Sequence, residues 1–167
     1  FGSVVKKLES LKLDYMIVGS LACNLYGTSR AAADIDIVIH LEPQRIPQFR
    51  QAFSHPRFYV PDSEDIRQAI LEKGIFNVIE VSTGLKADFH VLQDTPQAQR
   101  EFQRRRRRRF ISGLYAYYST PEDLILNKLE YFKRGNSEKH MCDIQDIVNA
   151  LGSQLDFGYI EWGAKEL

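Results

Sequence analysis

Short apolar blocks separated by turn residues run through the first 118 residues, and their spacing predicts a mixture of helices and strands. Residues 3–12 carry valine and leucine at helical intervals and predict a short amphipathic helix. The apolar run 15–18 predicts a buried strand, because it is compact and ends at the turn-forming pair Gly19-Ser20. Ser20 is then expected to cap a short helix over residues 21–26.

The same pattern continues as far as residue 118. Residues 34–39 alternate polar and apolar side chains before becoming apolar, which predicts a strand with two carboxylates on one face. Thr83-Gly84 separates two apolar runs and predicts a hairpin. The remaining elements expected here are helices at 43–53 and 63–73, the latter capped by Ser63, and strands at 76–82, 85–92 and 114–118.

Only helices are predicted after residue 118. Thr120 is a capping residue, Pro121 suits a first helical turn, and Glu122 and Asp123 are interpreted as helix-start acids. Helices are expected from there to Gly135, from Ser137 to about residue 151, and from about residue 156 to 167. The predicted fold class is α/β (α+β): a mixed twisted sheet flanked by helices over residues 1–118, with a C-terminal helical region, 119–167, packed on that core.

Composition narrows the classes of protein that fit. The 167 residues are 44% hydrophobic and 26% charged, as in an ordinary globular domain. Lys+Arg and Asp+Glu both total 22, so the zero net charge gives no global case for nucleic-acid binding. Two cysteines without a CxxC pair argue against a disulfide framework and a structural zinc site. No apolar run reaches the roughly 18 residues of a membrane span and no signal peptide is recognised, so we expect a cytoplasmic protein without membrane contact.

Asp34 and Asp36 give the clearest chemical signal. At positions i and i+2 of one strand their carboxylates point the same way, and two like charges this close are costly unless a cation lies between them. Mg²⁺ (or Mn²⁺) prefers such oxygen ligands and completes its shell with phosphate and water. Asp88, on a neighbouring predicted strand, would supply a third carboxylate. The alternative for Asp34 and Asp36 is a pair of solvated carboxylates at a strand start.

Gly19-Ser20 adds a place for phosphate. The pair lies at a strand-to-helix turn, where free backbone N–H groups and the serine hydroxyl are available to a phosphate, although helix capping is a competing role for Ser20. A phosphate site beside a carboxylate cluster is typical of phosphoryl or nucleotidyl transfer.

Six consecutive arginines occupy residues 104–109. Six like charges repel one another and resist packing, which favours a loop. The sequence leaves two interpretations of this run open: a solvated, flexible face, or a surface for a polyphosphate backbone such as that of tRNA.

Longer stretches resemble a known family. The segment IVGSLACNLYGTSRAAADIDIVI resembles the signature of the DNA-polymerase-β-type nucleotidyltransferase superfamily, and LKADFHV is similar to its third-carboxylate strand. The segments STPEDLILNKLEYFKRGNSEKHMCDIQDIVNAL and LDFGYIEWGAKEL resemble the C-terminal half of AbiEii-like proteins, the nucleotidyltransferase toxins of toxin–antitoxin and phage-defence systems. Two positions depart from the family pattern: residues 31–33 are alanines where a threonine is usual, and Cys142 stands where an arginine is common.

The resemblance implies a nucleotidyltransferase fold and a role for each matching residue. Asp34, Asp36 and Asp88 would be catalytic and bind the metal, and Asp88 would also help to deprotonate the attacking hydroxyl. The implied nucleotide-binding residues are Gly19, Ser20, Arg30, Lys128, Lys139, Asp143 and Asp146. Lys128 has the alternative of a solvated helix lysine, and Asp143 that of an ion pair with Lys139 at i−4.

The leading hypothesis is therefore an Mg²⁺-dependent enzyme that transfers an NMP from an NTP to a hydroxyl of a tRNA 3′ end or a protein. In the AbiEii-like setting it would act as a toxin and need a cognate antitoxin. The second hypothesis is a non-catalytic nucleotide- or RNA-binding module on the same fold, which the two departures from the family pattern favour. A third is an antitoxin-like or scaffold protein whose arginines only bind a partner.

Overall fold

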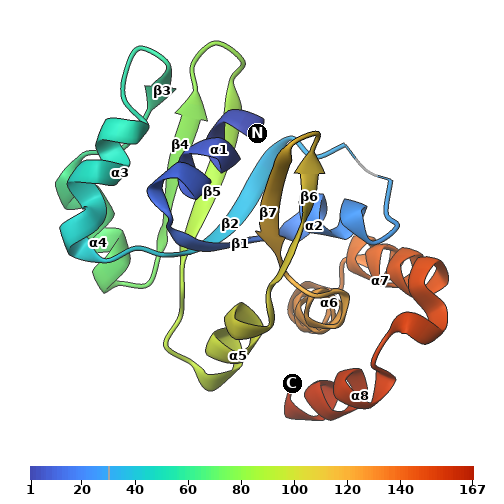
Figure 1. The fold of residues 1–167 in the computed structure, drawn as a ribbon. Coiled ribbons are helices and arrows are strands. Elements are labelled where there is room, and N and C mark those ends of the chain that lie inside the picture. Colours follow the sequence, from blue (N-terminus) through green and yellow to red (C-terminus); the bar gives the residue numbers. More distant parts are fainter. Residues whose placement is uncertain (30) are drawn as a thin grey trace.

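Seven strands form one mixed sheet in the computed structural model, which describes residues 1–29 and 31–167 (Figure 1). Arg30, predicted to bind nucleotide, lies outside the described residues. The strand order is β3-β4-β5-β2-β1-β7-β6. The strands are β1 (Asp14–Val18), β2 (Asp34–His40), β3 (Phe58–Tyr59), β4 (Ile75–Glu80), β5 (Leu85–Val91), β6 (Arg106–Ile111) and β7 (Leu114–Tyr118).

Helices and strands are interspersed up to β7, and only helices follow it. They are α1 (Gly2–Leu11), α2 (Gly19–Leu25), α3 (Ile46–Ala52), α4 (Ser63–Leu71), α5 (Pro96–Arg104), α6 (Pro121–Gly135), α7 (Glu138–Leu151) and α8 (Phe157–Glu166), with 3₁₀ turns at Pro43–Arg45 and Gly152–Gln154. This confirms the expected mixed α/β class and the helical C-terminal part. The division of the chain at residue 118 stays a prediction, because α6 packs against both α2 and α7. No helix in the described part of the chain is long and apolar enough to cross a membrane.

The two faces of the central strand β2 differ in burial. Its odd-numbered residues, Ile35, Ile37 and Ile39, are completely buried in the main core. Four phenylalanines of this core (Phe49, Phe53, Phe76 and Phe89) bring α3 onto the sheet with ring centroids 4.7–6.1 Å apart. The even-numbered residues Asp34, Asp36 and Val38 are only partly buried. The face of the sheet that carries the isoleucines therefore packs in the core, and the face that carries Asp34 and Asp36 is accessible to a ligand.

The arginine run is not a loop, so that prediction was wrong. Arg104 ends α5, and Arg106–Arg109 form most of β6, which pairs antiparallel with β7 at the edge of the sheet. Alternation sends successive guanidinium groups to opposite sides of the strand, which separates the like charges. Arg105 also pairs with Asp14 at 2.7 Å, and Arg107 lies 3.5 Å from Glu9. A charged edge strand is a common device against pairing between molecules.

Two of the predicted helix caps also differ. Helix α2 begins at Gly19, so Ser20 lies inside its first turn and makes no capping bond. The cap of α4 is Asp62 rather than Ser63, because its carboxylate accepts hydrogen bonds from two backbone N–H groups of the first turn. Thr120 caps α6 as predicted: its hydroxyl oxygen accepts from the backbone N–H of Asp123 at 3.2 Å.

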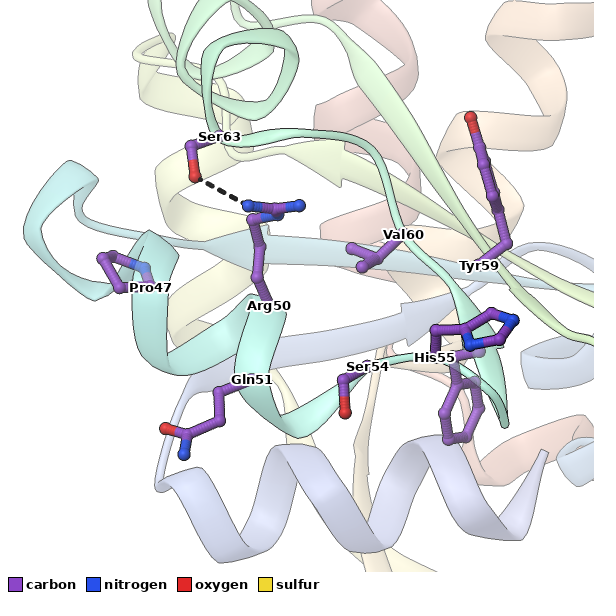
Figure 2. Close-up of a pocket in the computed structure, with 9 residues that line it drawn as sticks. Pro47, Arg50, Gln51, Ser54, His55, Tyr59, Val60 and Ser63 are labelled. Carbon is purple, nitrogen blue, oxygen red and sulfur yellow. Dashed lines mark hydrogen bonds between the residues drawn. The ribbon is translucent and has the colours of Figure 1, made fainter.

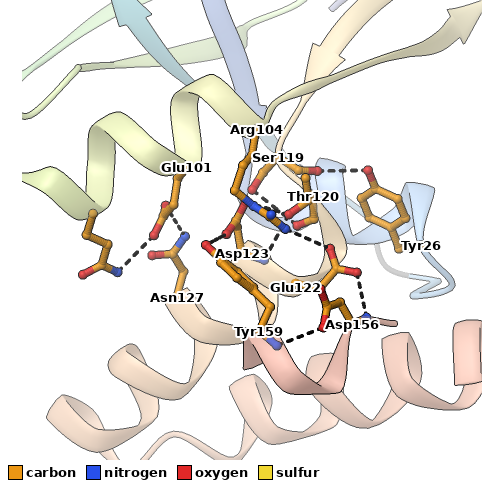
Figure 3. Close-up of polar contacts among 11 residues, drawn as sticks. Tyr26, Glu101, Arg104, Ser119, Thr120, Glu122, Asp123, Asn127, Asp156 and Tyr159 are labelled. Carbon is orange, nitrogen blue, oxygen red and sulfur yellow. Dashed lines mark hydrogen bonds and ion pairs between the residues drawn. The ribbon is translucent and has the colours of Figure 1, made fainter. Parts of the chain in front are cut away.

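A buried polar network holds the C-terminal helices to α5 (Figure 3). Asp123 and Glu122, expected as helix-start acids, are 0% and 4% exposed, and Arg104 faces both carboxylates at 3.2 and 3.7 Å. The Tyr159 hydroxyl of α8 donates to Asp123 at 2.7 Å, and the Arg104 guanidinium lies 3.8 Å from the Tyr159 ring centroid. Arg104 therefore joins α5, α6 and α8, which fixes α6 relative to the sheet.

Replacing Arg104 by methionine should lower the free energy of unfolding by about 2–3 kcal/mol, because two buried carboxylates lose their cationic partner. Urea denaturation followed by circular dichroism measures the loss. Arg67→Met is the matched control, since Arg67 pairs with Glu64 at the surface and should cost less than about 1 kcal/mol. Equal losses in the two variants would contradict the assigned role of Arg104.

Candidate active site

The pairing of β2 with β5 brings the three predicted aspartates onto one face of the sheet. The strands are parallel, with Asp36 opposite Asp88 and Asp34 opposite Lys86. Side chains opposite one another in neighbouring strands share a face, so the three carboxylates and the Lys86 ammonium form one cluster. The predicted hairpin of β4 and β5 is confirmed by their antiparallel pairing, and it places Asp88 here.

Gly19 brings the turn between β1 and α2 directly against this cluster. Its φ is +65°, a conformation that glycine adopts without strain. A Cβ atom at this position would overlap the Asp36 carboxylate, with the carboxylate carbon only 2.9 Å away. The glycine of the Gly-Ser pair is therefore required by conformation and by space, and Ser20 follows it in the first turn of α2.

A cavity of about 610 Å³ lies beside the cluster and collects several of the predicted residues. Of these, Gly19, Ser20, Asp36, Lys128 and Lys139 line it. The rest of the wall is supplied by Met16, Val18, Val38, His90, Val91, Leu92, Gln93, Ala98, Glu101, Leu124, Asn127, Tyr131, Arg134 and His140. The cavity thus joins the open face of the sheet to α5, α6 and α7.

Four of the other predicted residues lie outside this wall. Asp34 and Asp88 stand beside the cavity within the carboxylate cluster. Asp143 is 1% exposed and pairs with Lys128, whose Nζ lies 2.5 Å from its carboxylate oxygen. Asp143 therefore contacts Lys128 of α6 rather than facing the cavity. Asp146 is exposed on α7, away from the cavity wall.

Lys86 and His90 belong to the cluster, although neither was predicted as a site residue. The Lys86 ammonium lies 2.9 Å from Asp88 and 3.4 Å from Asp34, and the hydrogen bond to Asp88 is the main reason that the pKa of Lys86 is raised. His90 Nε2 lies 3.4 Å from Asp36 Oδ1. Their positions at i−2 and i+2 from Asp88 are a usable signal, because both must share its face of β5.

The outer part of the cavity carries an aromatic and basic rim. Tyr131 is 55% exposed and stacks on His140 of α7, with centroids 5.6 Å apart and planes inclined by 27°. Arg134 and Lys139 flank this pair on the same wall. An exposed ring beside cations suits a planar, negatively charged ligand such as a nucleotide. No motif marked Tyr131, because the stack depends on the angle between two helices.

The cluster fits a divalent cation by the chemistry of its donors. Three carboxylates from adjacent strands supply the hard oxygen ligands that Mg²⁺ prefers. Asp88 Oδ1 is buried and has no hydrogen-bond partner among the described residues, so it has an unused acceptor at this point. Even so, no three acidic, histidine or cysteine side chains in the described chain converge as a preformed metal site. The Lys86 ammonium lies against two of the three carboxylates, at 2.9 Å from Asp88 and 3.4 Å from Asp34.

A second cavity, of about 460 Å³, lies near the opposite edge of the sheet from β6 (Figure 2). It is formed by α3, β3 and the chain leading to α4, and none of the predicted site residues lines it. Its main cation, Arg50, donates to the Pro61 carbonyl at 3.0 Å and to the Ser63 hydroxyl at 3.2 Å. Arg50 thus fastens the connection between α3 and α4, and the cavity offers no comparable chemistry.

The chain has a nucleotidyltransferase fold, because its mixed sheet flanked by helices matches solved structures of that fold. It is similar to the solution structure of the antibiotic-resistance factor ANT(2'')-Ia, with a TM-score of 0.63 and 15% identity over 98% of this chain and 86% of the other. The crystal structure of ANT(2'')-Ia in complex with adenylyl-2''-tobramycin matches with a TM-score of 0.63 and 14% sequence identity, over 98% of this chain and 94% of the other. An antigenic nucleotidyltransferase-like protein from Paracoccidioides brasiliensis matches with a TM-score of 0.61 and 21% sequence identity, over 99% of this chain and 84% of the other. Neither protein-family models nor curated protein sequences match the chain.

Gly19→Ala should destabilise the protein by more than about 1 kcal/mol, because the new Cβ combines strained backbone with overlap of Asp36. Gly84→Ala is the matched control: Gly84 has a φ of +70° but open space around it, so only the backbone cost remains. Chemical denaturation of both variants separates the two effects. If Gly19→Ala is no more costly than Gly84→Ala, the close approach to Asp36 is wrong.

Glu101 gives a pH-dependent prediction. Burial raises its pKa, against the lowering effect of the amides of Asn127 and Gln97, and Asp123 and Glu130 raise it further (Figure 3). A raised pKa in the folded state means that stability present at acid pH is lost as the pH rises through that pKa. Glu101→Gln should therefore be more stable than the wild type at pH 7, and the gain should shrink by pH 4.

Thermal melts at the two pH values measure this difference, with the exposed Glu161→Gln as control. Either the Asn127 or the Gln97 amide can turn to present its oxygen to the new amide N–H, while the other keeps donating to the new amide oxygen, so the bonding is conserved. A Glu101→Gln variant that is less stable at pH 7 than at pH 4, relative to wild type, would overturn the prediction.

Proposed function

We propose that this protein is an Mg²⁺-dependent nucleotidyltransferase that transfers an NMP from an NTP to an acceptor hydroxyl. The observation that carries the proposal is the placement of Asp34, Asp36 and Asp88 on one face of two adjacent strands, at the edge of a cavity. The fold neighbours support it, since one of them is bound to adenylyl-2''-tobramycin, an acceptor that carries an adenylyl group.

Each wall of the site suits one part of the reaction. Gly19 and Ser20 would bind the triphosphate at the start of α2, and Lys128, fixed by Asp143, would add a positive charge from α6. Asp34, Asp36 and Asp88 would hold the metal, which supplies charge neutralisation at the reacting phosphate when bound. Asp88 would also accept the proton of the acceptor hydroxyl.

The acceptor and the biological setting form the finer part of the proposal. A tRNA 3′ end or a protein hydroxyl fits a cavity whose rim carries Arg134 and Lys139, since cations attract phosphate or acidic segments. The AbiEii-like resemblance of the C-terminal helices supports a role as the toxin of a toxin–antitoxin pair, which would bind a cognate antitoxin.

A non-catalytic nucleotide- or RNA-binding module is the second candidate. It is favoured by Lys86, a cation of the protein itself within the carboxylate cluster, and by the alanines at 31–33. Such a module would bind NTP equally well with and without Mg²⁺. Calorimetry in both conditions decides, because strict metal dependence contradicts it.

Asp36→Asn should lower the rate of NMP transfer by at least about 100-fold, because Asp36 is a metal ligand in the proposed mechanism. Purified protein is incubated with labelled NTP, Mg²⁺, total tRNA and lysate protein, and pyrophosphate and labelled acceptor are measured. Asp65→Asn, an exposed acid of α4, is the control and should keep the wild-type rate.

Two results would contradict the enzymatic proposal. One is a wild-type protein that binds NTP yet labels neither tRNA nor protein. The other is an Asp36→Asn variant as active as Asp65→Asn. Resolving the labelled species on a gel also identifies the acceptor, because RNA and protein products separate.

A further inference from the structure

Lys86 lies within the carboxylate cluster itself. It lies opposite Asp34 and two residues before Asp88, so its side chain shares the face of all three aspartates. Its Nζ contacts one carboxylate oxygen of Asp88 at 2.9 Å and one of Asp34 at 3.4 Å. The ammonium thus bridges carboxylates from two strands, which is the work that a divalent cation does in the proposed function.

The ammonium of Lys86 does not contact every oxygen of the three carboxylates. Lys86 contacts Oδ2 of Asp88, whereas Oδ1 is buried without a hydrogen-bond partner among the described residues. Asp34 is 42% exposed at its side chain, and His90 Nε2 lies 3.4 Å from Asp36 Oδ1. The carboxylates are therefore partly neutralised but not saturated, and a stronger cation can still compete for them.

We propose that Lys86 is a tethered cation that neutralises the site in the metal-free protein, and that the divalent ion binds by displacing its ammonium from Asp34 and Asp88. This inference rests on the proposed function, since it takes the three aspartates as metal ligands. Lys86 is then a positioning residue that sets the affinity for metal, and the protein binds metal more weakly than its carboxylates alone would allow.

The side chain of Lys86 can move away from the carboxylates at low cost. It is 34% exposed, its ammonium is carried on a flexible four-carbon stem, and an ammonium is readily hydrated. A divalent ion carries twice its charge and so attracts each carboxylate about twice as strongly at the same distance. At low metal concentration the tethered ammonium prevails, because it is always present beside the carboxylates.

The test is Mn²⁺ binding by isothermal titration calorimetry, checked by the loss of free Mn²⁺ signal in electron paramagnetic resonance. Lys86→Met keeps the length of the side chain without its charge and should bind Mn²⁺ at least about fivefold more tightly than wild type. Lys86→Arg keeps the charge and should stay close to wild type. Lys73→Met, which removes the surface pair of Lys73 with Asp94, should change nothing.

Thermal melts add a readout that does not involve the reaction. Metal-free Lys86→Met should melt below the wild type, because three neighbouring carboxylates lose their cation, and Mn²⁺ should raise its melting temperature more than that of wild type. If Lys86→Met fails to fold without metal, Lys86→Gln is purified with Mn²⁺ and compared after dialysis.

The outcomes separate this inference from the proposed function. Tighter binding in Lys86→Met with an unchanged Lys86→Arg supports the displacement. Equal or weaker binding in Lys86→Met overturns it, while the metal site itself stands. Absence of Mn²⁺ binding in every variant refutes both the metal site and the displacement.

Discussion

The parallel pairing of β2 with β5 is the contact on which the candidate site depends. It sets Asp36 opposite Asp88 and leaves Ile37 opposite Phe89 on the buried face. Because side chains alternate along a strand, a slip of one residue would turn Asp88 into the core and Phe89 into the site. The phenylalanine cluster under α3 makes that slip costly, so the apolar face of the sheet fixes the geometry of the polar one.

The second requirement is that α6 keeps its place against the open face of the sheet. Its first turn is held by the contact of Arg104 with Asp123, and its middle by the buried pair of Lys128 with Asp143. The two contacts reach α5 and α7, which supply the other walls of the cavity. The site is thus made by elements separated by about a hundred residues of chain, and buried charge pairs rather than loops fix its walls.

The strong local patterns of the sequence were enough to predict most of the fold. Strand 34–39, the Thr83-Gly84 hairpin and the Thr120 cap all depend on neighbours in sequence, and the structure confirms them. The loop predicted for the arginine run was wrong. Counting like charges along the sequence ignores that side chains alternate between the two sides of a strand, and that α1 and β1 supply acidic partners. The caps predicted at Ser20 and Ser63 were wrong by two positions and one position, because the exact ends of helices are the part of a helix that is hardest to predict.

The site was predictable to the same extent and for the same reason. Asp34 and Asp36 follow from spacing along one strand, and Asp88 from the Thr83-Gly84 turn together with the family resemblance; the structure brings the three together. Tyr131 and His140 could not be found in this way, since their stack depends on how α6 and α7 cross. The pairing of Lys128 with Asp143 likewise required the tertiary arrangement, because the sequence offered Lys139 as the nearer partner.

Two lysines of the site differ in burial, and the difference assigns them different roles. The side chains of Lys128 and Asp143 are 9% and 2% exposed, so separating this pair would move two buried charges apart, which is costly. Lys86 and Asp34 are 34% and 42% exposed, so water can replace either partner when they separate. A fixed cation suits the binding of a triphosphate, whose charge arrives with every substrate. A cation that can move away suits the carboxylates of β2 and β5. Their negative charges need a cation when no metal is bound, and their oxygens must be free to bind the metal when it arrives.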